Sequence, residues 1–145
     1  MNTSYDSSSR CPCLSGEVYG ACCGIYHDRF AVEGTLSAPS PEALMRSRFS
    51  AFAVNYPEYL LVTWAPETRP DPAGFELEED TRWYRLDIVD APAALGGDSG
   101  TVEFIAYYRS MPGASEPFKG SMHERSRFSR RDGVWYYVDG IQLGS

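Results

Sequence analysis

At 145 residues the chain is long enough for one domain and a small appended segment, and 43% hydrophobic and 14% aromatic residues suffice for a packed core. Thirteen basic and 20 acidic residues give a net charge of −7, which makes nucleic acids and anionic membranes poor partners. No apolar run approaches the roughly 20 residues of a membrane helix. The polar, serine-rich start lacks the apolar stretch of a signal peptide, so we expect a cytoplasmic protein.

Residues 1–10 are predicted to be a disordered tail. The next segment holds every cysteine of the chain in the pattern C-x-C-x8-C-C. The candidate metal ligands are Cys11, Cys13, Cys22 and Cys23. Two crossed disulfides would close only very short loops, and free reactive thiols are a further alternative. Four thiolates in two close pairs match a tetrahedral zinc site, which clustered cysteines usually indicate in a reducing compartment.

We therefore predict a structural Zn²⁺ in a small knuckle at residues 11–27, a segment too short to fold by hydrophobic burial alone. His27 is an alternative ligand if Cys23 is not used, although a histidine that packs beside the site is the simpler interpretation. Residues 28–40 contain glycine, proline and several small residues and are predicted to form a linker.

A helix is predicted from residue 41, because Ser40 can cap it and Pro41 suits its first turn. Four apolar residues recur along one face at helical spacing, which indicates core packing rather than contact with a cofactor. They are Met45, Phe49, Phe52 and Tyr56. A second short helix is expected at residues 58–64, before prolines break the regular structure.

The C-terminal half contains four segments with alternating polarity, most of them rich in aromatic and β-branched residues. They cover residues 83–89, 101–109, 119–130 and 134–141. Asp132 and Gly133 suit a type I′ hairpin turn between the last two segments. Helices followed by antiparallel strands predict an α+β domain at residues 41–142, with the helices covering one face of the sheet.

Alternation along the third strand places Glu124 with Met122 and Phe128 on the inner face of the sheet. A carboxylate there needs a partner, because an unpaired buried charge is costly. We expect Arg46 or Arg48 of the preceding helix to form an ion pair with Glu124 that locks the helix to the sheet. The alternative is that Glu124 is a polar group in the lining of a cavity.

The cysteine spacing resembles the SEC-C motif, a zinc knuckle of bacterial preprotein translocase ATPases and many other bacterial proteins. The usual Gly-Ser-Gly after the first cysteine pair is replaced by Leu-Ser-Gly from Leu14 onward, and leucine resists the positive φ that glycine permits. Residues 41–52, 123–128 and 135–140 resemble signatures of the YchJ-type (UPF0225) family. The resemblance implies an NTF2-like cone, in which helices pack on a strongly curved, mainly antiparallel sheet around an inner cavity. It implies no established reaction.

The favoured hypothesis for function is a protein-interaction or binding module. Four thiolates leave no open coordination position, so the zinc would be structural, and the partner would be another protein or a second copy of the chain. The alternative is a small-molecule binder or an enzyme that uses the cone. Its candidate cavity residues are Arg46, Arg48, Trp64, Tyr108, Glu124 and Tyr137, the last of which alternation turns outward.

Catalytic residues stay unknown, because the sequence shows no Ser-His-Asp set, paired-carboxylate motif or phosphate-binding loop, and we lean against an enzyme. The basic segment at residues 119–131 raises nucleic-acid contact as a third hypothesis. The net acidity of the chain makes a solvated strand face the better interpretation of that segment.

Overall fold

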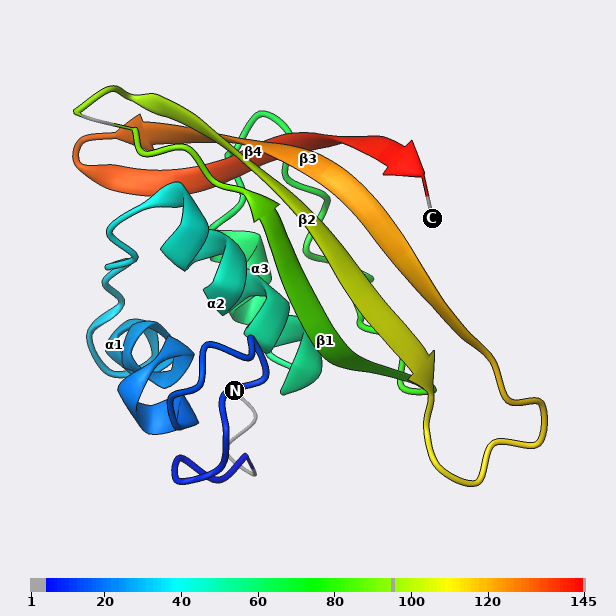
Figure 1. Cartoon of the computed structure of the whole chain (residues 1–145). Coiled ribbons are helices and arrows are strands. Elements are labelled where there is room, and N and C mark those ends of the chain that lie inside the picture. Colours follow the sequence, from blue (N-terminus) through cyan, green and yellow to red (C-terminus); the bar gives the residue numbers. More distant parts are fainter. Residues whose placement is uncertain (1–4, 95, 145) are drawn as a thin grey trace.

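A strongly curved antiparallel sheet dominates the computed structural model, which describes residues 5–94 and 96–144 (Figure 1). Its strands lie in the order β1-β2-β3-β4. They are β1 (Thr81–Asp90), β2 (Ser99–Ser110), β3 (Lys119–Arg131) and β4 (Val134–Gly144). Each strand pairs with the next one along the chain, so the sheet is a simple meander.

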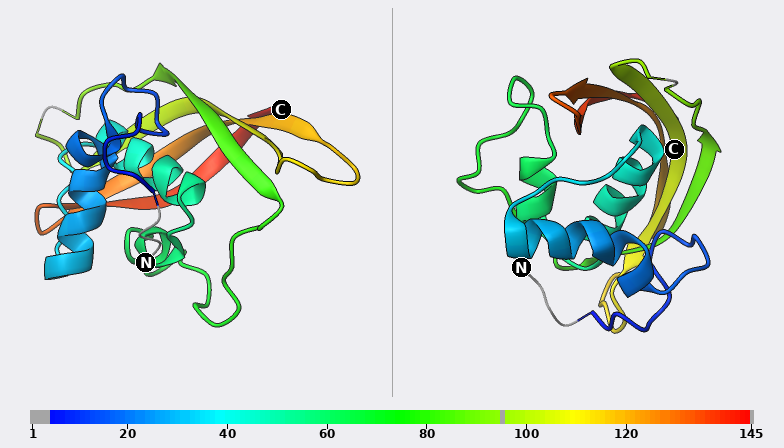
Figure 2. Two further views of the ribbon diagram at one scale, coloured as in Figure 1. Left: turned by 90° about the horizontal axis from the view of Figure 1, so that it is seen from below. Right: turned by 90° about the vertical axis from the view of Figure 1, so that its left-hand side faces the viewer.

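The helices lie on the concave side of this sheet. They are α1 (Cys23–Glu33), α2 (Pro41–Ala53) and α3 (Pro57–Val62), and a 3-10 turn, η1 (Tyr19–Ala21), precedes α1. Figure 2 shows α2 inside the curve of the sheet, and α1 packs against α2. The predicted α+β architecture is confirmed.

Local sequence signals explain where α2 and α3 begin. Ser40 Oγ accepts a hydrogen bond from the backbone N–H of Ala43 at 3.1 Å, and Pro41 occupies the first turn of α2. Asn55, with a φ of +60°, turns the chain out of α2. Helix α3, the second of the two predicted helices, then starts at Pro57, one residue before its predicted start.

The predicted linker was wrong in its first half. Residues 28–33 belong to α1, which ends at Gly34 with a φ of +71°. Because glycine adopts this left-handed conformation without strain, it marks the helix end. The connection to α2 is therefore confined to residues 34–40.

The predicted disordered tail was wrong for residues 5–10, and its residues 1–4 lie outside the described residues. The hydroxyl of Tyr5 donates to the carbonyl oxygen of Arg10 at 2.6 Å, and Arg10 forms an isolated antiparallel bridge with Val18. The segment before the first cysteine thus belongs to the same N-terminal lobe as the cysteines. We use the term metal lobe for residues 5–33.

The predicted hairpin turn is confirmed. Asp132 and Gly133 both have positive φ, +52° and +81°, as a type I′ turn requires. Of the residues predicted for the inner face of β3, Glu124 and Phe128 are buried and Met122 is half-buried. The buried residues around them are Ser126 on β3 and Val102, Phe104 and Ala106 on β2. None of the helices in the described ranges is long and apolar enough to cross a membrane.

Candidate metal centre and adjoining cavity

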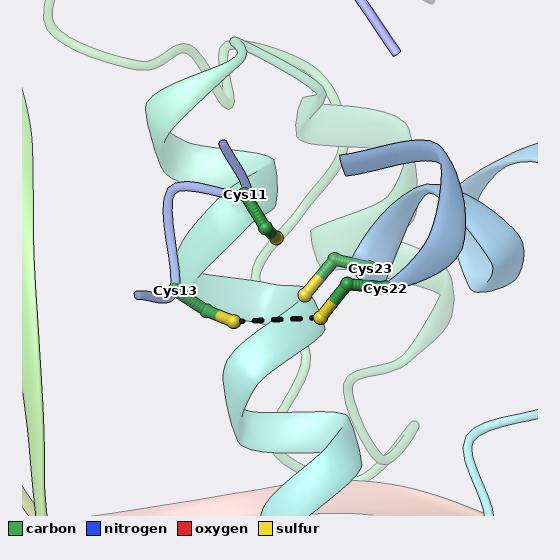
Figure 3. A group of neighbouring side chains, drawn as sticks. All are labelled: Cys11, Cys13, Cys22 and Cys23. Atoms are coloured by element: carbon green, nitrogen blue, oxygen red, sulfur yellow. Dashed lines mark hydrogen bonds between the residues drawn. The ribbon is translucent and has the colours of Figure 1, made fainter. Parts of the chain in front are cut away.

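The four cysteine side chains point toward a common centre (Figure 3). Cys11 and Cys13 lie in the loop before η1, and Cys22 and Cys23 lie where η1 passes into α1. All four Sγ atoms are within 4.8 Å of one another, and those of Cys13 and Cys22 are 3.6 Å apart. All four are free thiols rather than disulfides.

This donor set fits a closed four-thiolate metal site. Zn–S bonds of about 2.3 Å in a tetrahedron place the ligand sulfurs about 3.8 Å from each other, close to the observed spacing. Cys11, Cys13 and Cys23 are buried and Cys22 is half-buried. Four protein ligands would leave no coordination position for water, so an ion held here would have a structural role.

Two residues with positive φ shape the cysteine loop, Leu14 at +61° and Gly16 at +98°. The backbone N–H of Leu14 donates to the carbonyl oxygen of Cys11 at 3.0 Å. The backbone N–H of Cys11 donates to the carbonyl oxygen of Glu17 at 2.9 Å. Leu14 therefore adopts a conformation that suits glycine, at a cost of about 1 kcal/mol.

Two side chains of α2, Ser50 and Arg46, contact the cysteine segment. Ser50 Oγ lies 3.5 Å from Cys11 Sγ, and Arg46 Nη1 donates to the carbonyl oxygen of Cys13 at 3.1 Å. Arg46 Nε also pairs with Glu42 one turn earlier, at 2.9 Å. The prediction of Arg46 as a cavity residue was wrong, because its side chain lies on the metal side of α2.

His27 is buried between α1, η1 and α2, and it is not a member of the sulfur cluster. Its Nε2 lies 2.8 Å from the carbonyl oxygen of Ser47, and its Nδ1 contacts the hydroxyl of Tyr19. A carbonyl can only accept, so Nε2 donates to it and Nδ1 accepts from Tyr19. Burial lowers the pKa of His27 to about 4, which keeps the ring neutral. Both ring nitrogens are in use, which agrees with the packing interpretation.

The other face of α2 lines a cavity of about 130 Å³ between the helices and the sheet. We call it the inner cavity. Its polar side chains are Arg48, Glu124, Ser126 and Tyr137. Its apolar and aromatic walls are Met45, Phe49, Phe52, Trp64, Trp83, Phe104, Ala106 and Met122. A more open pocket of about 420 Å³, which we call the outer pocket, shares Phe52, Trp64 and Trp83 with the inner cavity. These three residues therefore stand at the mouth of the inner cavity.

Arg48 is the buried positive charge of the inner cavity, with 4% of its surface exposed. Its Nη1 donates to the carbonyl oxygen of Leu60 at 2.8 Å and to Thr63 Oγ1 at 2.7 Å. The guanidinium carbon lies 4.4 Å from the ring centre of Tyr137 and 5.1 Å from that of Trp64. Burial lowers the pKa of Arg48 to about 10, so the side chain remains protonated at neutral pH.

The predicted ion pair between Glu124 and a helix arginine was wrong, because neutral donors on the sheet satisfy this carboxylate. Its Oε2 accepts from Ser126 Oγ at 2.6 Å and from Tyr137 Oη at 3.4 Å, and its Oε1 accepts from Gln142 Nε2 at 2.8 Å. The carboxylate lies over Gly140, where a Cβ atom would overlap Oε2. The alternative prediction, a polar group in a cavity lining, matches the structure.

The structure brings only part of the predicted cavity set together. Arg48, Trp64, Glu124 and Tyr137 line the inner cavity, and Tyr108 lines the outer pocket. Tyr137 faces inward, because it pairs with the inner-face residue Phe128 and lies two residues from the buried Trp135, and the register of β3 and β4 shifts only beyond this pair. Sequence reasoning missed the roles of Ser126, Thr63 and Gln142. Only Ser126 carried a usable signal, because it shares the inner-face alternation of Glu124.

The arginine side chains of the basic strand β3 pair with carboxylates of neighbouring segments. Its four arginines form the ion pairs Arg125–Glu103, Arg127–Asp139, Arg130–Asp98 and Arg131–Glu67. Such pairs leave few free cations for a phosphate backbone.

Two known sequence families match separate parts of the chain, the cysteine segment and the domain that contains the sheet. Residues 40–140 match the family described as YchJ, middle NTF2-like domain, and residues 8–25 match the SEC-C motif. A UPF0225 protein of Streptomyces coelicolor is 47% identical over 131 residues, which cover 90% of this chain and 93% of the relative. The chain belongs to the UPF0225 (YchJ) family. A UPF0225 protein of Chromobacterium violaceum is 41% identical over 145 residues, covering 97% and 98% of the two chains.

Two solved structures resemble this UPF0225 chain over nearly its whole length. The solution structure of a SEC-C motif-containing protein from Rhodopseudomonas palustris has a TM-score of 0.70 at 36% identity, covering 92% of this chain and 98% of that one. The crystal structure of a SEC-C motif-containing protein from Psychrobacter arcticus has a TM-score of 0.75 at 29% identity, covering 96% and 85%. The predicted fold, a SEC-C segment followed by an NTF2-like domain, is confirmed.

Proposed function

We propose that this UPF0225 protein is a binding module whose four cysteines hold a structural Zn²⁺ and whose inner cavity takes up a small molecule. The observation that supports it most directly is Arg48, a buried charge that forms no ion pair with any described residue and lies in an otherwise mostly apolar cavity that meets a wider pocket. A concave apolar site with few polar groups is the usual composition of a ligand pocket. The reduced cysteines suit a reducing compartment, so we place the protein in the cytoplasm.

The polar groups of the inner cavity favour binding over catalysis. Among the described residues that line it, Glu124 is the one carboxylate, and three neutral donors hold it in place. Burial raises the pKa of Tyr137 to about 12, so its hydroxyl stays protonated at neutral pH. The hydroxyl of Tyr137 donates to Glu124 itself, as does that of Ser126, and no other described residue of the lining pairs with Glu124 or Tyr137 as the nucleophile or base of a hydrolase or isomerase.

The zinc in this proposal is a cross-link. Bound by the four thiolates, it would tie the loop of Cys11 and Cys13 to the start of α1, and the contacts of Ser50 and Arg46 extend that link to α2. Zinc contributes on the order of 10 kcal/mol to the folding of such short segments. The bound zinc would thus also stabilise the position of α2, which forms one wall of the inner cavity.

Metal analysis of the reduced full chain tests the zinc proposal, with about one zinc per chain expected. Cys13→Ser should lose most of the metal and accelerate hydrogen exchange in residues 5–27. Ser9→Ala is the matched control, because the described hydrogen bonds of Ser9 use its backbone only. A zinc content near zero in carefully reduced wild-type protein would overturn the proposal.

Uptake by the inner cavity is tested with benzyl alcohol, a neutral probe of about one ring. Trp64 and Trp83 stand at the mouth, so their fluorescence should change in a saturable way. Ala106→Leu adds atoms to the cavity and should abolish the change, while Val89→Leu on an exposed site of β1 should not. An identical response of the wild type and Ala106→Leu would contradict uptake at this position.

A protein partner at the metal lobe is the second candidate function, and exposed apolar side chains favour it. Leu14 and Val18 flank the cysteine loop, and Ile25 and Val32 lie seven residues apart on α1. With a net charge of −7, the chain suits a basic partner that presents an apolar surface. Capture of one partner should be lost with Ile25→Ser and with zinc removal. A partner retained unchanged after zinc removal would count against the metal lobe as the binding surface.

A further inference from the structure

We infer that the ligand of the inner cavity is a small monocarboxylate, whose two oxygens pair with the Nε–Nη2 edge of Arg48 and whose apolar body fills the cavity. This inference rests on the proposed uptake of a small molecule and adds the chemical class of that molecule.

Part of the donor capacity of Arg48 is unused by the described residues. A guanidinium has five N–H groups, and both hydrogen bonds of Arg48 start from Nη1. Nε and Nη2 donate to none of the described residues, yet neither is among the polar atoms that are sealed from solvent without a partner. They therefore retain access to open space, and Arg48 lines the inner cavity. Two parallel N–H groups on one edge match the two oxygens of a carboxylate.

The lining of the inner cavity contains charges of both signs, Arg48 and Glu124. Glu124 is the nearest candidate counter-ion, but its oxygens are engaged by Ser126, Gln142 and Tyr137. Tyr137 offers its ring face to Arg48 and its hydroxyl to Glu124. Within the part of the chain that the structure describes, Arg48 thus has acceptors and aromatic faces around it but no carboxylate in direct contact. An incoming anion would form the charge-assisted pair that the chain itself does not supply.

The volume of the inner cavity and the charges at its mouth limit which ligands fit. At about 130 Å³ the inner cavity is similar in size to the cavity of roughly 150 Å³ that takes up benzene in a well-studied engineered case. The apolar body should therefore be about one six-membered ring or a short branched chain. Glu76 and Glu78 line the outer pocket at the mouth, so a second negative charge there would be repelled. These limits favour a monocarboxylate over dicarboxylates and phosphate esters.

The experiment titrates zinc-loaded full chain with benzoate, benzamide and benzamidine, followed by calorimetry and tryptophan fluorescence. These ligands share shape and differ in charge. Benzoate should bind with a Kd on the order of 0.1–1 mM, a strength normal for so few atoms. Benzamide should bind at least about 10-fold more weakly, because it cannot form two charge-assisted hydrogen bonds with Arg48. Benzamidine should not bind.

Variants identify the residue responsible. Arg48→Lys keeps the charge but loses the fork, so benzoate should bind about 10-fold more weakly. Arg48→Met should abolish benzoate binding, and Arg127→Met, on an exposed ion pair of β3, should leave it unchanged. Because Arg48→Met also removes two buried hydrogen bonds, its fold is checked by circular dichroism. Ala106→Leu, which retains Arg48, blocks the cavity independently and should also abolish benzoate binding.

The outcomes separate this inference from the proposed function. Equal affinity for benzoate and benzamide, or a preference for benzamidine, would overturn the carboxylate assignment and leave uptake by the cavity intact. Benzoate binding that survives both Arg48→Lys and Ala106→Leu would place the ligand elsewhere and overturn the inference. Failure of all ring-sized probes, benzyl alcohol included, would overturn both.

Discussion

Acid should destabilise this protein through one buried imidazole. The pKa of His27 is lowered by burial from 6.5 to about 4, so between these values the unfolded chain binds a proton that the folded chain does not. The contribution of His27 to the free energy of unfolding is therefore complete above pH 6.5 and declines as the pH falls toward 4. With about 1.4 kcal/mol per pH unit, the loss reaches roughly 2.5 kcal/mol at pH 4.5.

The assay is urea denaturation in half-unit steps from pH 7.5 to 4.5, with zinc in excess, for the wild type and His27→Gln. Glutamine retains an amide N–H that can donate to the carbonyl oxygen of Ser47, but it does not titrate. Carboxylates and metal binding respond to pH in both proteins, so the difference between the two curves isolates His27. Curves that stay parallel from pH 6.5 to 4.5 would refute the reasoning. NMR titration of the His27 ring gives the folded-state pKa directly.

Three substitutions test other parts of the structure, each by chemical denaturation of zinc-loaded protein. Gly140→Ala should cost about 2–3 kcal/mol, because the new methyl group displaces the buried carboxylate of Glu124 from its donors; an unchanged midpoint would contradict the close approach. Leu14→Gly should stabilise by up to about 1 kcal/mol by relieving the positive φ, and a clear loss would show that the leucine side chain contributes more than its exposure suggests. Tyr59→Phe should cost about 1–2 kcal/mol, because Ser47 Oγ loses a buried hydrogen bond of 2.8 Å; a neutral result would mean that the bond adds no net stability.

Local chemistry made much of the fold predictable. Four cysteines in two close pairs indicated the metal cluster, and Ser40 before Pro41 indicated the start of α2, because both signals act within a few residues. The Asp132–Gly133 turn and the alternation of β2 are of the same kind. Helix α1 was missed, because its residues were divided between the predicted knuckle at 11–27 and the predicted linker at 28–40, although Gly34 marks the end of a helix.

Contacts between distant segments were less accessible from the sequence. Arg46 and Arg48 are two positions apart on α2 and so face opposite sides, and the stripe that includes Met45 and Phe52 already placed Arg48 with the apolar face. The ion pair failed for a different reason. No pattern within β3 or β4 reveals that Ser126, Tyr137 and Gln142 satisfy Glu124, because that depends on the register shift between these two strands.

Because α2 carries the cysteine cluster on one side and the inner cavity on the other, the proposed metal loading and ligand uptake would be coupled through this one helix. Such coupling is reciprocal: if loss of the ion loosens the helix and weakens uptake, uptake must tighten retention of the ion by the same factor. Protein exposed to chelators during purification would then show weakened affinity for every ligand in a screen. In the cell, the zinc supply would determine which fraction of the protein can bind its ligand.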